Sequence, residues 1–114
     1  MEIINEKVCI LLPTYNGEKF LEEQLASYAN QKHQDWYLVA MDDCSSDDSL
    51  NILNNFRDKY PSKVLVIPNE DNIGVHKAFE KLIKNAPDFN YYMFSDQDDV
   101  WHPEKINVLL SKLI

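Results

Sequence analysis

Short apolar runs alternate with longer amphipathic segments along the chain. Four of the runs are rich in β-branched and aromatic residues and are bounded by proline or polar residues, so they predict strands, at residues 8–12, 36–41, 63–67 and 91–94. Four longer segments repeat apolar residues every three or four positions and predict helices, at about residues 18–31, after Ser45, over 75–85 and after Pro103. The first run is apolar throughout until Pro13 ends it, which is typical of a strand buried on both faces.

The helical segments also predict how the helices begin and which side chains face the core. Ser45 and Asp48 form an S-x-x-D capping pattern before the second helix, and Pro103 occupies the first position of the last one. The positions expected to face inward share a helical spacing: Phe20, Leu21, Leu25 and Tyr28; Leu50, Leu53 and Phe56; Phe79, Leu82 and Ile83; and Ile106, Leu109, Leu110 and Leu113.

The order of strands and helices predicts a single α/β domain over residues 1–114, with a mostly parallel sheet and helices on both faces. Open sheets of this kind bind ligands beyond the carboxyl ends of their strands. Polar clusters follow three of the predicted strands, at Thr14-Tyr15-Asn16, Asp42-Asp43 and Asp96-Gln97-Asp98-Asp99. We therefore expect these clusters to meet at one edge of the sheet.

Composition narrows the classes of function. The chain has 19 acidic and 11 basic residues, and its formal net charge of −8 argues against nucleic-acid binding because phosphate repels an acidic surface. No apolar run approaches the length of a membrane span, and no secretory signal opens the chain. Cys9 and Cys44 have no spacing typical of a zinc site or a disulfide framework, which favours a reducing, cytoplasmic setting.

The acidic clusters are the candidate chemistry, because neighbouring carboxylates need a cation or strong hydrogen-bond donors. Side chains at i and i+2 of an extended segment point to the same side, so Asp96 and Asp98 can converge on one Mg²⁺ or Mn²⁺ ion. The alternative is a solvated acidic turn, and for Asp99 we expect a local capping role near the last helix. For Asp42 and Asp43 the alternative is attraction to the positive end of the following helix.

Four segments of the sequence together resemble the family 2 inverting glycosyltransferases, which have the GT-A fold. They are VCILLPTYNG at 8–17, MDDCSSD at 41–47, NEDNIG at 69–74 and FSDQDDVWHP at 94–103, the last containing the D-x-D strand end. Each segment is weakly specific alone, but four in the family's order are specific together. Cys44 departs from the usual Gly or Asn, and we expect a modest backbone adjustment there. Family members also continue well past residue 114.

The resemblance implies roles for individual residues in binding a nucleotide sugar. It implies that Asp98 coordinates the metal and that Asp96 contacts the ribose and reaches the metal. It further implies that Asp43 accepts a hydrogen bond from the base, with Pro13 and Tyr15 beside that base; for Tyr15 the alternative is packing under a loop. The expected donor is UDP- or dTDP-linked, and Mn²⁺ or Mg²⁺ would stabilise the diphosphate leaving group.

The resemblance also implies a sugar transfer with inversion to the hydroxyl of a glycan or lipid-linked acceptor. The general base is expected beyond Ile114, so the isolated chain should transfer little sugar. The longer protein would act in the cytoplasm, at the inner face of the membrane. Lys77 is expected to be an exposed helix lysine, and all three histidines are expected to be surface or capping residues.

Two other functions remain open at this stage. A haloacid dehalogenase-type phosphatase would use Asp96 as nucleophile and Asp98 as acid, but it leaves the clusters near Tyr15 and Asp43 unexplained. A non-catalytic nucleotide-binding module would keep the fold without turnover. An exposed apolar sheet edge would in addition permit self-association.

Overall fold

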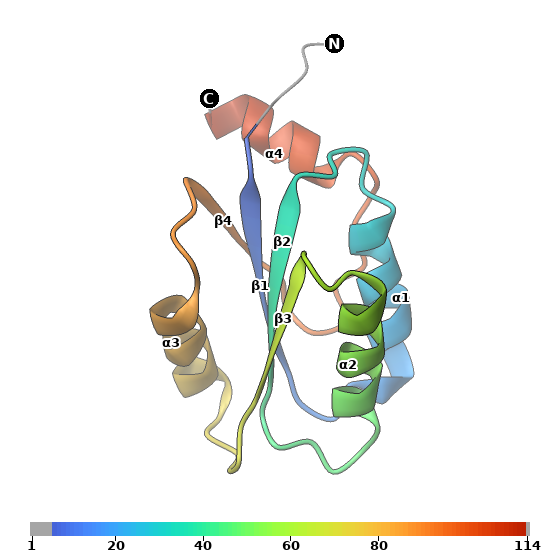
Figure 1. Ribbon diagram of the computed structural model, residues 1–114, viewed down its shortest axis with the longest axis vertical. Helices are drawn as coiled ribbons and strands as arrows, with labels where there is room; N and C mark the ends of the chain where they lie inside the picture. Colours follow the sequence, from blue (N-terminus) through green and yellow to red (C-terminus); the bar gives the residue numbers. More distant parts are fainter. Residues whose placement is uncertain (1–5, 114) are drawn as a thin grey trace.

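The computed structural model describes residues 6–113, in which strands and helices alternate as predicted (Figure 1). In chain order the elements are β1 (Val8–Thr14), α1 (Glu18–Ala29), β2 (Trp36–Asp42), α2 (Ser49–Lys59), β3 (Val64–Pro68), α3 (Val75–Asn85), β4 (Tyr91–Phe94) and α4 (Lys105–Leu113).

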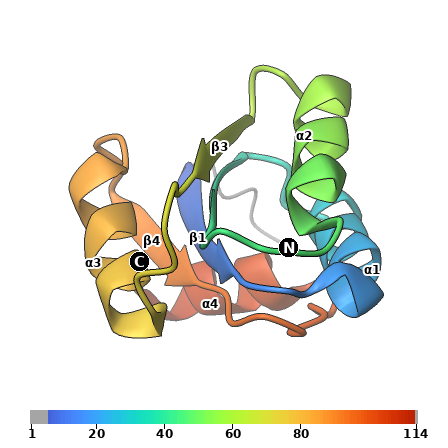
Figure 2. The same ribbon diagram turned by 90° about the horizontal axis from the view of Figure 1, so that it is seen from below.

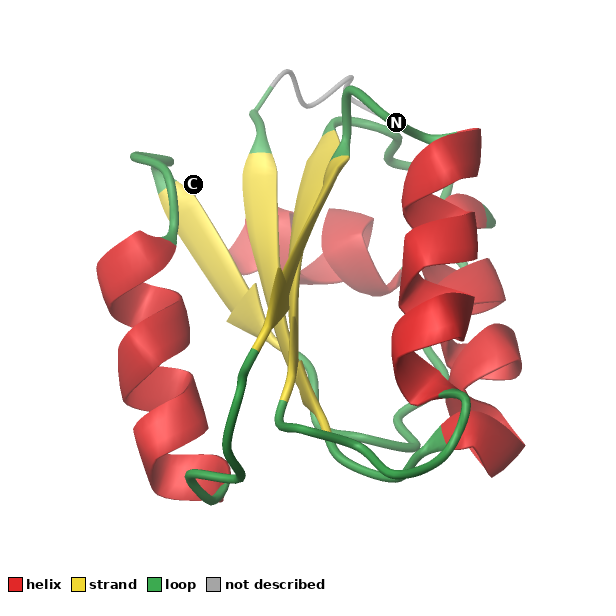
Figure 3. Cartoon of the chain, turned by 60° about the horizontal axis from the view of Figure 1, so that its bottom comes forward, coloured by secondary structure: helices red, strands yellow, loops and turns green. Residues whose placement is uncertain are grey.

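The four strands form one fully parallel sheet in the order β3-β2-β1-β4. The first two crossovers lead from β1 to β2 and from β2 to β3. The third crosses back over β2 and β1 to the opposite edge of the sheet, where β4 pairs with β1. Because parallel crossovers are right-handed, this reversal places α3 on the opposite face from α1 and α2, as Figures 1 and 3 show. The predicted fold class is confirmed, and the strand order reverses between β1 and β4, where such sheets bind ligands.

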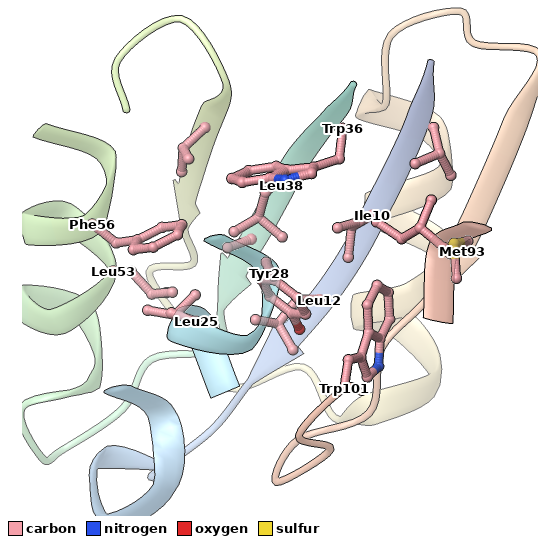
Figure 4. Close-up of a cluster of buried hydrophobic side chains, with 14 of the residues drawn as sticks. Ile10, Leu12, Leu25, Tyr28, Trp36, Leu38, Leu53, Phe56, Met93 and Trp101 are labelled. Carbon is pink, nitrogen blue, oxygen red and sulfur yellow. The ribbon is translucent and has the colours of Figure 1, made fainter. Parts of the chain in front are cut away.

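Each face of the sheet has its own core. On one face, alternate side chains of the strands pack against α1, α2 and α4, with Tyr28 and Trp101 in edge-to-face contact at 4.9 Å between ring centroids (Figure 4). On the other face, Cys9, Leu11, Val39 and Met41 pack against α3. Because α3 is the only helix there in the described part of the chain, Phe94 of β4 keeps 55% of its surface exposed.

Three side chains that were expected to face inward do not. Phe20, Ile83 and Leu113 are 43%, 56% and 62% exposed. Phe20 stands beside Leu21 and Ile83 beside Leu82, and both neighbours face the core, because one step along a helix turns the side chain by about 100°. Leu113 is the last residue of α4. In α1 the inward position is filled instead by Gln24, which is fully buried.

The predicted helix starts were also too early. Helix α2 begins at Ser49, the Asp48 side chain makes no capping hydrogen bond, and Ser45 bonds to Asp42 instead of to the helix. Helix α4 begins at Lys105, two residues after Pro103. In both cases a turn held by other contacts separates the polar signal from the first helical residue.

Strand β1 continues through Pro13 to Thr14, although the proline was expected to end it. The carbonyl of Leu11 accepts a hydrogen bond from Ser95 N at 2.9 Å, so the backbone groups of Leu11 point toward β4. Two residues on, Pro13 faces the same way, but β4 ends at Phe94, opposite Leu11. The missing N–H of Pro13 therefore removes no bond from the sheet.

Two expectations from composition can be compared with the structure. No helix among residues 6–113 is long and apolar enough to cross a membrane. Cys9 and Cys44 are both free thiols, and burial raises the pKa of the Cys9 thiol to about 12, which leaves it protonated and unreactive at neutral pH.

Candidate functional site

A cavity of about 330 Å³ opens at the carboxyl ends of β1 and β4, where the strand order reverses; Figure 2 views the molecule from this end. It is lined by Pro13, Thr14, Tyr15, Asp43, Asn72, Gly74, Val75, Ala78, Asp96 and Gln97. The structure thus brings together all four residues expected to bind the nucleotide, although Asp98 is not part of the lining. A larger hollow of about 410 Å³ lies between α1 and α2, away from the strand ends, and none of the predicted site residues lines it.

Asp43 is 4% exposed, and its carboxylate holds the loop that follows β3. Oδ1 accepts hydrogen bonds from Asn69 Nδ2 at 3.0 Å and Ile73 N at 2.9 Å, and Oδ2 accepts one from Gly74 N at 2.9 Å. Lys81 Nζ donates to Asn69 Oδ1 at 2.7 Å, so the Asn69 side chain lies between the Lys81 ammonium and the Asp43 carboxylate. These contacts explain the spacing of the NEDNIG segment, and they leave Oδ2 with one free acceptor position.

Asp42, 2% exposed, holds a second loop. Its carboxylate accepts hydrogen bonds from Ser45 N at 3.0 Å, Ser45 Oγ at 2.6 Å and Thr14 Oγ1 at 3.2 Å. Asp42 thus supports the turn that follows β2. Neither Asp42 nor Asp43 hydrogen-bonds to a backbone N–H of α2 within the described residues, so neither acid caps that helix through a hydrogen bond.

The D-x-D segment is a turn and not an extended strand end. Asp99 N donates to Asp96 O at 3.2 Å, and Asp98 has the left-handed backbone angle φ = 72°. The prediction of an extended segment that places Asp96 and Asp98 on the same side is therefore wrong. Both Asp96 and Asp98 are exposed, and neither carboxylate accepts a hydrogen bond or forms an ion pair with any residue between 6 and 113.

These two free carboxylates fit a divalent cation that also binds a ligand. No group of three or more His, Cys, Asp or Glu able to hold a metal occurs within the described residues. A complete protein cage is thus absent from this region, but Mg²⁺ and Mn²⁺ commonly bind through one or two carboxylates with phosphate oxygens and water as the remaining ligands. Asp96, which lines the cavity, and Asp98 are the residues that would hold such an ion.

Asp99 points away from the other two acids, as expected. Its Oδ2 accepts a hydrogen bond from Trp101 Nε1 at 3.1 Å and lies 3.9 Å from Nζ of Lys105, the first residue of α4. The third carboxylate of the cluster is therefore used within the fold.

Tyr15 is 48% exposed and lines the cavity, so the alternative of packing under a loop is wrong. Its N–H donates to Gln97 Oε1 at 2.7 Å. The middle residue of the D-x-D segment thus joins the end of β1 to the turn after β4. Gly17 leaves room for this link, because a Cβ there would lie 2.9 Å from the Gln97 side chain.

Four residues with positive φ lie in the loops at this edge of the sheet. Asn16, Cys44 and Asp98 have φ of 49°, 62° and 72°, and Gly74 has φ of 85°. The left-handed region suits glycine and asparagine, which accounts for the residue types usual at position 44. Cys44 adopts this backbone conformation, and its thiol donates to Glu70 O at 3.3 Å.

The remaining polar candidates lie outside the cavity lining. Lys77 is exposed on α3 as expected, and His102 Nδ1 accepts a hydrogen bond from Glu104 N ahead of α4. His33 is 7% exposed, with Nε2 at 2.7 Å from Glu6 O, so its assignment to the surface is wrong.

Gln24 was not predicted from the sequence, although it contacts the D-x-D turn at two points and Ser95, directly before it, at a third. The signal was present, because Gln24 shares the apolar face of α1 with Leu21, Leu25 and Tyr28. A polar side chain on the inward stripe of a helix predicts a buried hydrogen-bond network.

The chain is similar to known proteins in both sequence and structure. The model of the family described as "Glycosyl transferase family 2" matches residues 9–114. The chain is similar to the dTDP-rhamnosyl transferase RfbG of Shigella flexneri, with 40% identity over 106 residues that cover 90% of this chain and 37% of that protein. It is 31% identical over 99 residues to the putative teichuronic acid biosynthesis glycosyltransferase TuaG of Bacillus subtilis, covering 87% and 38%.

Solved structures agree with this match. TarS 1-349 of S. aureus in complex with UDP-GlcNAc superposes with a TM-score of 0.82 at 31% identity, covering 92% of this chain and 30% of that one. The mannosyltransferase PcManGT of Pyrobaculum calidifontis, in complex with GDP-Man and Mn²⁺, gives a TM-score of 0.81 at 19% identity, a likeness of fold alone. The chain spans about a third of the length of these relatives.

Proposed function

The chain belongs to glycosyl transferase family 2, and on this basis we propose that it binds the nucleoside-diphosphate sugar for a metal-dependent, inverting transfer to an acceptor hydroxyl. The observation that carries the proposal is the pair of free carboxylates, Asp96 and Asp98, beside a cavity that Pro13, Tyr15 and Asp43 also line. Family membership leaves the phosphatase alternative without support.

In this proposal the two acids hold Mn²⁺ or Mg²⁺ against the diphosphate. The metal, when bound, would act as a Lewis acid and stabilise the departing diphosphate. Asp96 reaches the cavity and would also contact the ribose, while Tyr15, with half of its surface exposed, would lie against the base. No hydrogen bond of either carboxylate to the described residues has to break before a cation binds.

Titration with UDP, with and without Mn²⁺, tests the metal site. Asp98→Asn should abolish the metal-dependent part of UDP binding. The matched control is Asp99→Asn, which removes the same charge from the same turn but from a carboxylate already bonded to Trp101 and paired with Lys105. If both variants lose metal-dependent binding equally, general electrostatics and not coordination is responsible. Metal-independent binding by the unmodified chain would favour the non-catalytic module.

We further propose that Asp43 Oδ2 reads the base with the acceptor position left free by Gly74 N. Uracil and thymine present an N3–H donor, whereas N3 of cytosine is an acceptor. Two of the relatives that are at least 30% identical, the dTDP-rhamnosyl transferase RfbG and TarS with UDP-GlcNAc, name a pyrimidine nucleotide, and both nucleotides carry the N3–H donor. UDP and dTDP should therefore bind the chain at least tenfold more tightly than CDP, whose pyrimidine ring has almost the same shape. Equal affinities would remove this role from Asp43.

The general base would come from sequence beyond Ile114, and the acceptor would be a glycan or a lipid-linked glycan. Apart from Asp43 and Asp96, no carboxylate lines the cavity in the described residues, and both of these have donor-side roles in the proposal. The 114-residue chain should then bind UDP-sugar and transfer little of it. Fast transfer by this chain would contradict that assignment. The free thiols are compatible with action in the cytoplasm, at the inner face of the membrane.

The uncovered side of β4 supports the predicted self-association. Tyr92 and Phe94 point to the α3 face and are 41% and 55% exposed, and Val75 and Ile83 of α3 are 59% and 56% exposed. Light scattering during gel filtration at two concentrations should show a dimer that Phe94→Ser weakens. A monomer at every concentration would contradict this proposal.

A further inference from the structure

The turn that carries Asp96 and Asp98 has little support from its own backbone. One weak turn bond, from Asp99 N to Asp96 O at 3.2 Å, closes it. Asp98 has a left-handed backbone, which is unfavourable for a residue with a side chain. Two exposed carboxylates two residues apart also repel each other. Something outside the turn must therefore keep it in this conformation.

That support comes from Gln24 of α1, which is fully buried beneath the turn. Its Nε2 donates to Asp96 O at 2.6 Å and to Ser95 Oγ at 3.2 Å, and its Oε1 accepts from Asp98 N at 3.2 Å. A carbonyl oxygen needs a donor and an N–H needs an acceptor, so only one orientation of the amide satisfies both aspartates. The single side chain thus fixes the backbone on each side of Gln97.

The glutamine is itself held in place. Ser95 is fully buried, and its Oγ lies 2.5 Å from the hydroxyl of Tyr28, one helical turn after Gln24 on α1. Burial raises the pKa of Tyr28, so the phenol stays protonated and keeps this bond at any ordinary pH. Tyr28 also packs edge-to-face on Trp101 in the core (Figure 4). The side chains that support the turn are therefore buried and bonded to one another.

We propose that Gln24 is a positioning residue for the metal site: it sets the backbone of the D-x-D turn so that Asp96 and Asp98 present their carboxylates to one cation. This inference rests on the proposed function, since it assumes that these two acids hold the metal. Residues that orient metal ligands typically contribute a factor of about 10–100 to metal affinity. An apolar residue of the same size at position 24 should lower the affinity by that factor without emptying the core.

The chain contains a matched control at Gln31, seven residues later and just past the end of α1. Gln31 is 2% exposed and makes the same number of bonds: Nε2 donates to His102 O at 2.8 Å and to Ser27 O at 3.1 Å, and Oε1 accepts from Ile106 N at 3.2 Å. It holds the approach to α4 and has no bond to the D-x-D turn. Substitution at either glutamine removes three comparable bonds, so only the position differs.

The experiment compares Gln24→Met with Gln31→Met in the 114-residue chain. Binding of Mn²⁺ is followed by the loss of the free-ion EPR signal in the presence of UDP. Gln24→Met should weaken Mn²⁺ binding at least tenfold, while Gln31→Met should stay within about twofold of the unmodified chain. Amide exchange at Asp98 should be accelerated in Gln24→Met only. Gln24→Glu keeps the size and the acceptor but loses the donor to Asp96 O. If Gln24→Met does not fold, Gln24→Glu replaces it in the comparison of Mn²⁺ binding, with the same weakening expected.

Asp98→Asn, measured in parallel, separates the two proposals. Mn²⁺ binding that Asp98→Asn abolishes and Gln24→Met leaves unchanged would overturn the role of Gln24 and keep the proposed function. Equal losses in Gln24→Met and Gln31→Met would reduce Gln24 to a general stability residue and overturn the inference. Absence of Mn²⁺-dependent UDP binding in the unmodified chain would overturn both.

Discussion

Two pairs of acids stand at the same edge of the sheet and are used in opposite ways. Asp42 and Asp43, after β2, are 2% and 4% exposed, and each carboxylate accepts three hydrogen bonds from the neighbouring loops. Asp96 and Asp98, after β4, are exposed and accept none from the described residues. The carboxylates of the first pair are bonded within the fold and hold the loops that form the cavity. Those of the second pair are free to bind a ligand. Identical side chains at equivalent strand ends therefore differ by how many donors the fold supplies.

The largest effect on stability is expected from the removal of the Asp43 carboxylate. Asp43→Ala leaves Asn69 Nδ2, Ile73 N and Gly74 N without their acceptor, and the free energy of unfolding should fall by about 2–4 kcal/mol. Urea unfolding followed by far-UV circular dichroism measures it, with Asp98→Ala as the control. Equal losses for the two alanines would mean that the buried carboxylate does not hold the loop.

Gly74 N donates to Asp43 Oδ2, and the backbone of this donor can be strained while Asp43 is kept. Gly74 has φ = 85°, and a Cβ added there meets no other atom within 4 Å, so Gly74→Ala tests the backbone conformation alone. It should lower the free energy of unfolding by about 1–2 kcal/mol. An unchanged denaturation midpoint would show that the loop can reach Asp43 in another conformation.

Cys44, directly after Asp43, should respond in the opposite direction. Its φ of 62° favours glycine, and its thiol makes only one exposed bond to Glu70 O. Cys44→Gly should raise the free energy of unfolding by about 0.5 kcal/mol, since relief of the left-handed strain exceeds the entropy cost of glycine. Cys44→Ala keeps the strain and serves as control; a gain equal to that of glycine would assign the effect to the thiol.

Removing the charge of the second pair should leave the fold almost unchanged. The double substitution Asp96→Asn and Asp98→Asn breaks no hydrogen bond of either carboxylate within the described residues, so the free energy of unfolding should stay within about 0.5 kcal/mol. The thermal midpoint measures this in metal-free buffer. A loss of several kcal/mol would reveal that these acids are structural, as Asp43 is.

The smallest effect on stability is expected at Glu104, before α4, whose carboxylate forms an ion pair with Lys32. The hydrogen bond from Lys32 Nζ to Glu104, at 2.7 Å, lowers the pKa of Glu104 below its usual 4.5. A lowered pKa stabilises the fold above pH 4.5, and this contribution is lost as the pH falls through the lower folded-state value. The unmodified chain should thus be slightly more stable than Glu104→Gln at pH 7 and equal to it near pH 2. A difference that persists at low pH would point to packing.

Particular residues show what the sequence could and could not predict. The strands, the parallel order and the meeting of Pro13, Tyr15, Asp43 and Asp96 at one edge were predictable, because they follow from apolar runs and from where they stop. The turn at Asp98 was not, because a left-handed residue leaves no mark in a D-x-D pattern.

Contacts between distant segments were equally out of reach. The bonds of Asp43 depend on the chain after β3 folding back over it, about 30 residues later. Gln24 is an intermediate case: its place on the inward stripe of α1 indicated a buried network, but not which turn, 72 residues away, would complete it.

The proline within β1 has a consequence for the shape of the molecule as a whole. On the side of β4, the pairing with β1 ends at Leu11, and the next residue of β1 that faces this side, Pro13, has no backbone N–H to donate. The last strand leaves the sheet at that point, and Pro13 lines the cavity that opens beside it. Because Pro13 has no backbone N–H, it offers no donor with which a longer β4 could extend its pairing across the opening of the cavity.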